Sequence, residues 1–228
     1  MNYAFQVPSQ AALAIQGSEQ LFPIHRIYCV GRNFADHAKE MGAEVPKGTP
    51  VFFMKPADAA TQSAQVPYPT ATQDLHHEVE LVVALGTNIP NELTYENAMQ
   101  AVFAYGIGLD LTRRDLQAIA KEKRLPWDIS KGFDHSAPIS ILVEAKQAKI
   151  RPETQISLRI NNELRQQACV GDMIFSIPEI LIELSKLFKL QAGDLIFMGT
   201  PAGVAALQRG DTFTADLQEV VSLSGALI

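Results

Sequence analysis

The stretch His76-His77-Glu78-Val79-Glu80-Leu81-Val82-Val83 decides how the rest of the chain is interpreted, because it places two carboxylates in an apolar strand pattern. Alternate side chains of an extended strand share a face, so we expect Glu78 and Glu80 to point the same way, with Cα atoms ~7 Å apart. His76 is expected on that face and His77 on the other. Neighbouring carboxylates repel, and burial of either one alone is costly. A hard divalent cation such as Mg²⁺ removes both penalties; the alternative is an edge strand with solvated glutamates.

The segments around this stretch are mostly short apolar runs with strand patterns, and few have helical spacing. Further strands are expected at 26–30, 51–54, 66–68, 102–111, 139–143, 156–160, 195–198, 212–217 and 220–227, and helices at 34–41, 91–100, 113–124 and 178–188. The expected strand of the opening stretch runs over 76–85. Because strands dominate and a regular βα alternation is missing, we predict an α+β fold with mixed, mostly antiparallel sheets and a few helices.

Size and charge restrict the classes of function. The 228 residues suffice for one large domain or two small ones, and the formal net charge of −6 argues against nucleic acid or an anionic membrane as partner. An anionic substrate would therefore need local positive charge. The isolated Cys29 and Cys169, with no signal-peptide pattern and no long apolar run, lead us to expect a cytoplasmic protein that does not span a membrane.

Asp110 offers a third carboxylate for the same site. It ends an apolar strand pattern, next to the flexible Gly106 and Gly108. Three oxygen ligands with open positions form a magnesium or manganese pattern and not a zinc pattern. The alternative is that Asp110 caps the helix that follows it.

His37 and Glu40 lie three residues apart on an expected helix, hence on one face. A glutamate beside a histidine orients the ring, so the pair can take a proton from water and return it. The alternative is an ordinary polar pair on a surface helix. Segment 42–50 carries two glycines and two prolines and is expected to be a loop.

Several polar residues near these segments could contact a substrate. Arg114 could pair with a carboxylate, Gln117 could donate a hydrogen bond, and Lys131 could bring an ammonium toward a developing enolate. The turn at 199–203 exposes backbone N–H groups and the Thr200 hydroxyl, a common way to hold a carboxylate. For each residue alone, a solvated role is the alternative.

Five motifs in this order resemble the fumarylacetoacetate hydrolase family, especially its short members, the acylpyruvases and the oxaloacetate decarboxylases or tautomerases. The resemblance runs from about residue 26 to near the C-terminus, over the motifs at 29–37, 76–81, 108–115, 172–178 and 193–201. It implies a layered, β-roll-like catalytic domain at 26–228, which usually forms a homodimer. Residues 1–25 have no assigned role. The larger N-terminal domain of true fumarylacetoacetases has no counterpart, so their substrate is not implied.

The resemblance also implies roles for single residues. The metal ligands fall on Glu78, Glu80 and Asp110, for Mg²⁺ or else Mn²⁺. The catalytic groups fall on His37, Glu40 and Lys131, and the substrate-binding positions on Arg32, Arg114, Gln117 and Thr200.

The activity implied is Mg²⁺-dependent cleavage of a carbon–carbon bond in a 3-acylpyruvate, giving pyruvate and a carboxylic acid. The substrate would be a small anionic 2-oxo acid. Decarboxylation or tautomerisation of oxaloacetate, and isomerisation of hydroxymuconate-type diacids, use the same enolate chemistry and stay open. A binding module with purely structural carboxylates is the non-enzymatic alternative.

Overall fold

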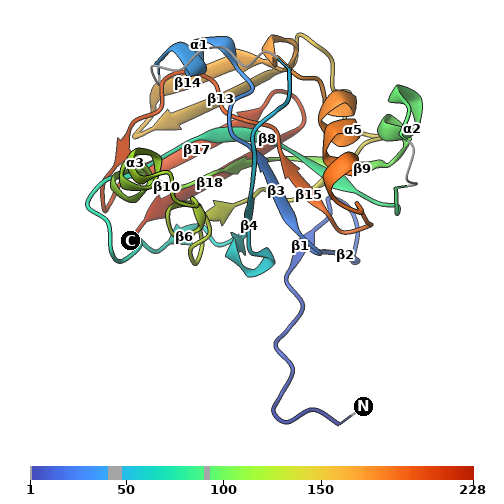
Figure 1. Ribbon diagram of the computed structural model, residues 1–228, viewed down its shortest axis with the longest axis horizontal. Helices are drawn as coiled ribbons and strands as arrows, with labels where there is room; N and C mark the ends of the chain where they lie inside the picture. The colour runs from blue at the N-terminus through green and yellow to red at the C-terminus, as the bar shows by residue number, and fades with distance from the viewer. Residues whose placement is uncertain (1, 41–47, 90–92) are drawn as a thin grey trace.

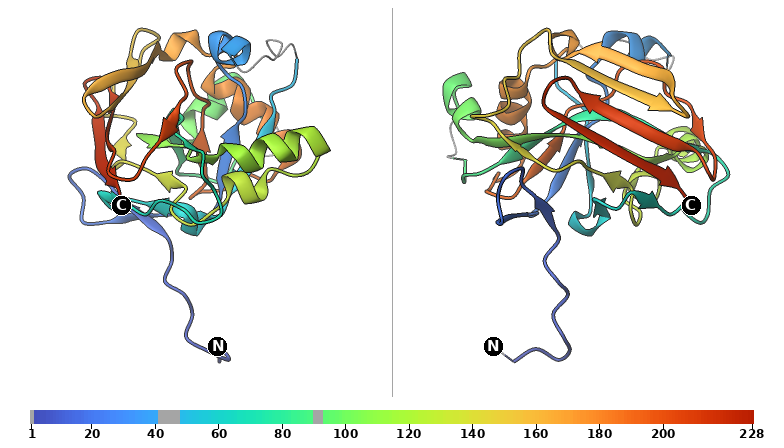
Figure 2. Two further views of the ribbon diagram at one scale, coloured as in Figure 1. Left: turned by 90° about the vertical axis from the view of Figure 1, so that its left-hand side faces the viewer. Right: turned by 180° about the vertical axis from the view of Figure 1, so that it is seen from behind.

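The computed structural model describes residues 2–40, 48–89 and 93–228. Two sheets form its body (Figures 1 and 2). The six-stranded sheet contains, in spatial order, β12 (Val143–Glu144), β9 (Val102–Leu109), β8 (Val79–Leu85), β15 (Leu195–Phe197), β3 (Ile27–Val30) and β4 (Phe52–Lys55). The five-stranded sheet, facing the viewer on the right of Figure 2, contains β14 (Glu163–Cys169), β13 (Gln155–Ile160), β17 (Thr212–Leu217), β18 (Val221–Leu227) and β6 (Gln65–Val66).

Smaller elements surround these sheets. Three short sheets pair β10 (Thr112–Arg113), β7 (Leu75–His76) and β16 (Ala206–Leu207), then β1 (Ala12–Ala14) with β2 (Leu21–Pro23), and β11 (Ala137–Pro138) with β5 (Ala60–Thr61). The α-helices are α1 (Ala35–Glu40), α2 (Tyr95–Gln100), α3 (Arg114–Lys123), α4 (Asp128–Lys131) and α5 (Ile177–Leu187), and 3₁₀ turns cover Ala57–Ala59 and Val170–Asp172. Within the described ranges, no helix has the length and apolar character needed to cross a bilayer.

The pairing of strands confirms the predicted fold class. In the six-stranded sheet β3 and β15 run parallel, and in the five-stranded sheet β6 and β18 do, while the other neighbours are antiparallel. The sheets are therefore mixed and mostly antiparallel, with few helices.

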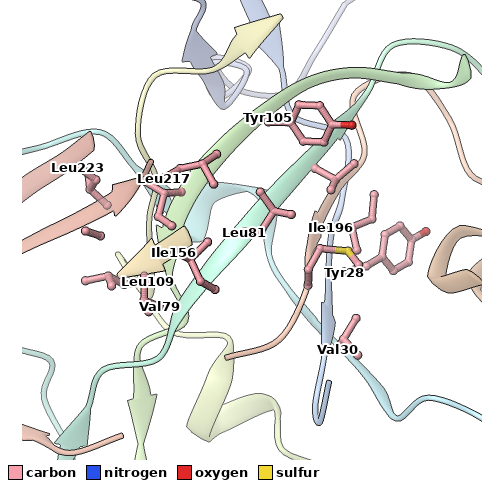
Figure 3. Close-up of a cluster of buried hydrophobic side chains, with 14 of the residues drawn as sticks. Tyr28, Val30, Val79, Leu81, Tyr105, Leu109, Ile156, Ile196, Leu217 and Leu223 are labelled. Atoms are coloured by element: carbon pink, nitrogen blue, oxygen red, sulfur yellow. The ribbon is translucent and has the colours of Figure 1, made fainter. Parts of the chain in front are cut away.

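The main hydrophobic core lies between the two large sheets. Leu81 and Leu109 from the six-stranded sheet belong to the same buried cluster as Ile156, Leu217 and Leu223 from the five-stranded sheet (Figure 3). Each strand contributes alternate residues to this cluster because its side chains alternate between faces. Helix α5 adds a row of buried aliphatic residues, and its N-cap is Ser176, whose backbone N–H and hydroxyl donate to Glu179.

A second buried cluster covers the opposite face of the six-stranded sheet. Val82 and Phe197 of that sheet pack there with Leu13 and Phe22 from β1 and β2. The N-terminal segment thus completes the burial of a sheet face, which explains why β8 is buried along its whole length. A strand covered on both faces shows no apolar–polar alternation.

Two predicted strands differ from the structure. The strand expected at 139–143 is not continuous, because β11 ends at Pro138 and β12 begins at Val143, with isolated bridges at Ile139 and Leu142 between them. The expected strand at 76–85 is interrupted at His77 and Glu78, because β7 pairs with β10 and β16 while β8 pairs with β9 and β15. The chain changes sheets at this interruption. His76 consequently does not join the carboxylates: its Nε2 lies 2.8 Å from Asp74 Oδ1.

Helix α3 lies close to its expected bounds, but its inner face differs from the expected one. In the sequence, the apolar Leu116, Ile119 and Ala120 mark one side of this helix as its inner face, whereas the structure buries Gln117 and Ala120 and leaves Ile119 45% exposed. The inner face is polar because it lines the site described below. The end of the helix expected at 34–41, the start of the one at 91–100, and most of the expected loop at 42–50 lie outside the described residues.

Candidate functional site

Three buried carboxylates meet where β8 begins and β9 ends. In the antiparallel register Glu80 pairs with Gly108, and the Asp110 N–H donates to the Glu78 carbonyl oxygen at 2.8 Å. This register brings one carboxylate oxygen from each of the three residues within 4.8 Å of the others. Glu78, Glu80 and Asp110 are here called the carboxylate cluster. Glu78 and Glu80 point the same way, as expected for residues two apart, and pairing between strands adds Asp110.

Basic side chains neutralise two members of the carboxylate cluster. Lys131 Nζ donates to Glu78 Oε2 at 2.7 Å and to Asp110 Oδ2 at 2.6 Å, and Arg114 Nη2 donates to Glu78 Oε1 at 2.6 Å. Asp110 is fully buried, and α3 is preceded by Arg113 without a side-chain cap, so Asp110 is not the helix cap considered above.

These contacts set the protonation states. Burial raises the pKa of Glu78, but Lys131 and Arg114 outweigh it and hold that pKa well below its ordinary value. Burial lowers the pKa of Lys131, but Asp110 and Glu78 outweigh it and raise that pKa above its ordinary value. Glu78 and Lys131 are therefore both charged at neutral pH.

Glu80 is in a different position, because no basic side chain in the described part of the chain contacts it. Its carboxylate is 1% exposed and accepts a hydrogen bond from the Gly199 N–H at 2.6 Å. Burial, and then the nearby Asp110 and Glu78, raise the pKa of Glu80 well above its ordinary value. A buried acid beside two other acids requires either a proton or a further cation.

A divalent metal fits this arrangement. Asp110 Oδ1 is buried and accepts no hydrogen bond, although Lys55 Nζ forms an ion pair with it at 2.8 Å. The donor set of the carboxylate cluster consists of carboxylate oxygens alone, which suits hard ions such as Mg²⁺ or Mn²⁺. Residue types and geometry both support such an ion at this place.

Lys55 is a site residue that the sequence analysis missed. Its Nζ donates to the carbonyl oxygens of Leu111 and Lys131, and its side chain is fully buried beside Asp110. The signal available was a lysine that ends an apolar strand, Phe52-Phe53-Met54-Lys55, but a lysine at that position is usually solvated.

His37 and Glu40 lie on one side of α1 as expected. His37 Nδ1 is 3.5 Å from Glu40 Oε2, and the His37 side chain is 5% exposed against 36% for Glu40. Burial lowers the pKa of His37, and the charges of Glu78 and Glu40 offset only part of this shift. The imidazole is therefore neutral near pH 7 and able to accept a proton.

The turn at 199–203 holds carboxylates, as its pattern predicts, but they belong to the protein. Gly199 donates to Glu80, and Gly203 donates to both oxygens of Glu40 at 3.1 Å. Thr200 Oγ1 accepts from Gln166 Nε2 at 2.8 Å. Gln166 also contacts His77 and the Val79 N–H, and the sequence analysis missed it because nothing distinguishes it from the other glutamines of β14.

A small hollow beside Glu78 of the carboxylate cluster is a candidate place for a substrate. Its lining includes the expected Arg32, His37, Glu78, Arg114, Gln117 and Lys131, and adds Gly31, Phe53, Lys121 and Trp127; Thr200 is not among them. We call it the substrate hollow. A larger hollow of about 490 Å³ lies elsewhere, near Tyr68 and Phe133, and contains no carboxylate cluster.

Comparison with known proteins matches residues 26–227 to the family described as fumarylacetoacetate (FAA) hydrolase C-terminal. The chain belongs to the fumarylacetoacetate hydrolase family. This confirms the resemblance found in the sequence, and the members named below are enzymes.

Three relatives of this family member are informative. It is 41% identical to an oxaloacetate tautomerase of Escherichia coli over 201 residues, covering 87% of this chain and 91% of the relative. It is 42% identical to a mitochondrial oxaloacetate tautomerase of Rattus norvegicus over 198 residues, covering 86% and 89%. The crystal structure of fumarylpyruvate hydrolase from Pseudomonas aeruginosa, in complex with Mn²⁺ and pyruvate, superposes with a TM-score of 0.96 at 40% identity, covering 100% and 99%.

Proposed function

We propose that this protein is a divalent-metal-dependent hydrolase that cleaves a carbon–carbon bond of a 3-acylpyruvate, giving pyruvate and a carboxylic acid. The observation that carries the proposal is that the neutral His37 and Glu78, a member of the carboxylate cluster, border one substrate hollow. The similarity to a fumarylpyruvate hydrolase that binds Mn²⁺ and pyruvate supports it. We propose Mg²⁺ as the physiological ion, with Mn²⁺ as a substitute.

The bound ion would be held by Glu78, Glu80 and Asp110, and would supply Lewis-acid polarisation of the 2-oxo acid oxygens. The chain's own groups provide the rest. Arg114 and Gln117 lie three residues apart on α3, with Arg114 Nη1 2.5 Å from Gln117 Oε1, and both face the substrate hollow. We assign them to the carboxylate of the pyruvate moiety, which the planar guanidinium can bind with two parallel hydrogen bonds.

His37 would act as the general base. It takes a proton from a water molecule whose oxygen attacks the distal acyl carbonyl, while Glu40 stabilises the resulting imidazolium. The bond between the acyl carbon and the methylene then breaks, and its electron pair remains on the methylene as the pyruvate enolate. The enolate regains a proton, so the products are one pyruvate and one carboxylic acid.

Lys131 would offset the charge of the enolate. Its ammonium is buried, charged and fixed between Glu78 and Asp110, so it needs no reorganisation when negative charge develops nearby. Fixed charges of this kind stabilise a transition state more than mobile ones.

The test is a pyruvate-release assay on acetylpyruvate and fumarylpyruvate, with Mg²⁺ and with EDTA. We expect release that depends on Mg²⁺ and falls ~10²–10⁴-fold in His37→Ala, the usual range for loss of a general base. Equal rates in Mg²⁺ and EDTA, or an active His37→Ala variant, would contradict the proposal.

Tautomerisation of oxaloacetate is the second candidate, favoured by the names of the Escherichia coli and Rattus norvegicus relatives. It moves one proton between carbon and oxygen and breaks no carbon–carbon bond, so it needs no attacking water. Ultraviolet absorbance of the enol of oxaloacetate measures it directly. Enol decay without release of pyruvate from either acylpyruvate would favour this candidate. Decarboxylation, by contrast, should survive in His37→Ala.

The remaining expectations also stay predictions. A small anionic 2-oxo acid is the proposed partner, and the homodimer is expected from the family resemblance alone.

A further inference from the structure

An apolar groove lies next to the substrate hollow and is open to solvent. Residues 51–54 line one side and residues 125–128 the other, around a space of about 420 Å³, and Asp128 is the one charged group among these lining residues. Val51, Met54 and Leu125 are 40%, 37% and 52% exposed. Large apolar side chains exposed together mark an interaction surface. We call this surface the apolar groove.

The strand along the apolar groove is also an unpaired edge. β4 is the last strand of the six-stranded sheet and, among the described residues, it pairs with β3 alone. Native proteins usually protect such an edge from pairing with another chain by exposed charges or by a cover. The one charged residue of β4 is Lys55, and its ammonium is buried beside Asp110, so it does not protect the edge. The edge and the groove together therefore suit an extended apolar segment.

The N-terminal arm, residues 2–10, is a segment of this kind. It contains no helix or strand and projects from the body of the structure (Figures 1 and 2). None of its side chains is charged. Tyr3, Phe5 and Val7 are 66%, 78% and 52% exposed, and because they are two residues apart they share a face when the arm is extended. The arm thus exposes an apolar face with the spacing of a β-strand.

We propose that the N-terminal arm of one copy of this chain docks in the apolar groove of a second copy, with Phe5 and Val7 as its anchors. In a two-fold symmetric pair each copy gives one arm and receives one. Nine extended residues span about 30 Å, which suffices to reach from one body to the next. The uncharged arm also adds no repulsion between two copies that each carry a net charge of −6.

Docking of the arm would complete the wall of the substrate hollow. Phe53 and Trp127 line both the hollow and the apolar groove, and their ring centroids lie 5.8 Å apart. An arm packed against these rings from the groove excludes water from them and restricts their rotamers. The second copy thereby contributes to the hollow without providing a catalytic group, and this contribution does not depend on which reaction the protein catalyses.

Trp127 is the single tryptophan of the chain, so tryptophan fluorescence reports on the apolar groove. We expect Phe5→Ser to shift the emission to longer wavelength, because the indole becomes more exposed to water. Gln6→Ser is the matched control, since Gln6 is exposed and lies on the opposite face of an extended arm. It should emit as wild type does. The same emission from wild type and both variants would overturn the inference.

Disulfide trapping shows whether the arm docks between chains. Phe5→Cys, carrying an affinity tag, is mixed with untagged Leu125→Cys or Met54→Cys, which lie on the two sides of the groove. All variants also carry Cys169→Ser, and the remaining Cys29 is buried. We expect the tag to retain an untagged chain that reductant releases, because a disulfide forms where the Cβ atoms come within about 4 Å.

Leu187→Cys is the control partner in this mixture. Leu187 is 60% exposed, as a leucine at the end of α5, and it does not line the apolar groove. It should form little product with Phe5→Cys. Equal trapping at Leu187 and in the groove, or no trapping at either groove position, would overturn the inference. A disulfide that forms only within one chain, in the Phe5→Cys, Leu125→Cys double variant, would place the arm in its own groove and overturn it as well.

Discussion

The backbone N–H of Gly203 donates to both carboxylate oxygens of Glu40, at 3.1 Å each. Four residues earlier, Gly199 donates to Glu80 of the carboxylate cluster. One turn therefore holds a member of the candidate catalytic pair and a member of the candidate metal site. The relative position of the two groups depends on the conformation of this turn.

Gly203→Ala should disturb that arrangement. Gly203 has φ +98°, and a Cβ there would lie 2.0 Å from the Arg165 carbonyl oxygen. We expect a loss of stability of about 2–3 kcal/mol, as for a strained backbone, with reduced kcat because Glu40 moves. Gly210→Ala is the control, since Gly210 also has positive φ but open space around it. Urea unfolding and pyruvate release measure both effects, and equal losses in the two variants would contradict the role given to the turn.

The lowered pKa of His37 predicts the pH dependence of activity. Burial holds the imidazole neutral, so the base form should persist below the ordinary value of about 6.5. We expect the acid limb of kcat/KM, which reports the free enzyme, to lie below that pH. An acid limb above pH 6.5 would show that His37 is not the base in this environment.

The same shift has a consequence for stability. The folded state favours neutral His37. The stabilisation of the fold by this group is therefore present above the unfolded pKa of about 6.5, and it is lost as pH falls through the lowered folded pKa. His37→Gln should remove this part of the acid destabilisation, measured as urea midpoints between pH 5 and 8.

Gln166 should matter for the geometry of both the metal site and the turn. Its Oε1 accepts from the Val79 N–H at 3.1 Å and lies 2.9 Å from His77 Nδ1, while its Nε2 donates to Thr200 Oγ1 and to the Pro201 carbonyl. Gln166→Leu leaves these buried groups unsatisfied, so we expect a loss of about 2–4 kcal/mol.

The neighbouring Gln167 supplies the control for this substitution. It is exposed and makes a side-chain hydrogen bond to Gln155 at 3.1 Å. Gln167→Leu should change stability by less than about 0.5 kcal/mol in chemical denaturation. If both leucine variants behave alike, Gln166 does not have the supporting role that its contacts indicate.

Lys55→Met should strongly destabilise the protein, although lysine is rarely a core residue. It removes a cation beside the buried Asp110 and the donor to two carbonyl oxygens, those of Leu111 and Lys131. Breaking a buried ion pair in this way costs about 3–5 kcal/mol. Lys149→Met, at an exposed position, is the control in the same denaturation series. A small effect at Lys55 would mean that Asp110 does not need this charge.

The sequence predicts the class of fold well because strand patterns and helix caps are local features. The capping residues Ser176 and Glu179, and the apolar runs of β9 and β17, are visible without any knowledge of tertiary contacts. The interruption at His77 is not, since it arises from pairing with β10, β16 and β9, which are distant in the chain.

The residues of the candidate site also divide into those that the sequence predicts and those that it does not. Glu78, Glu80 and Asp110 stand out because carboxylates in apolar strands need an explanation. Lys55 and Gln166 carry no such signal, because each is buried only through contacts across sheets. Lys121 could have been found from its helical spacing with Arg114, but spacing alone does not show which face of α3 is buried.

The most direct test of the account is a titration of Mn²⁺ followed by the electron paramagnetic resonance signal of the free ion. The account predicts one Mn²⁺ bound per chain, competed by Mg²⁺, and binding weakened at least ~100-fold in a Glu80→Gln, Asp110→Asn double variant that keeps its circular dichroism spectrum. Glu219→Gln, at an exposed acid, should bind as wild type does. No bound Mn²⁺ in wild type, or unchanged binding in the double variant, would contradict the assignment of the carboxylate cluster as a metal site.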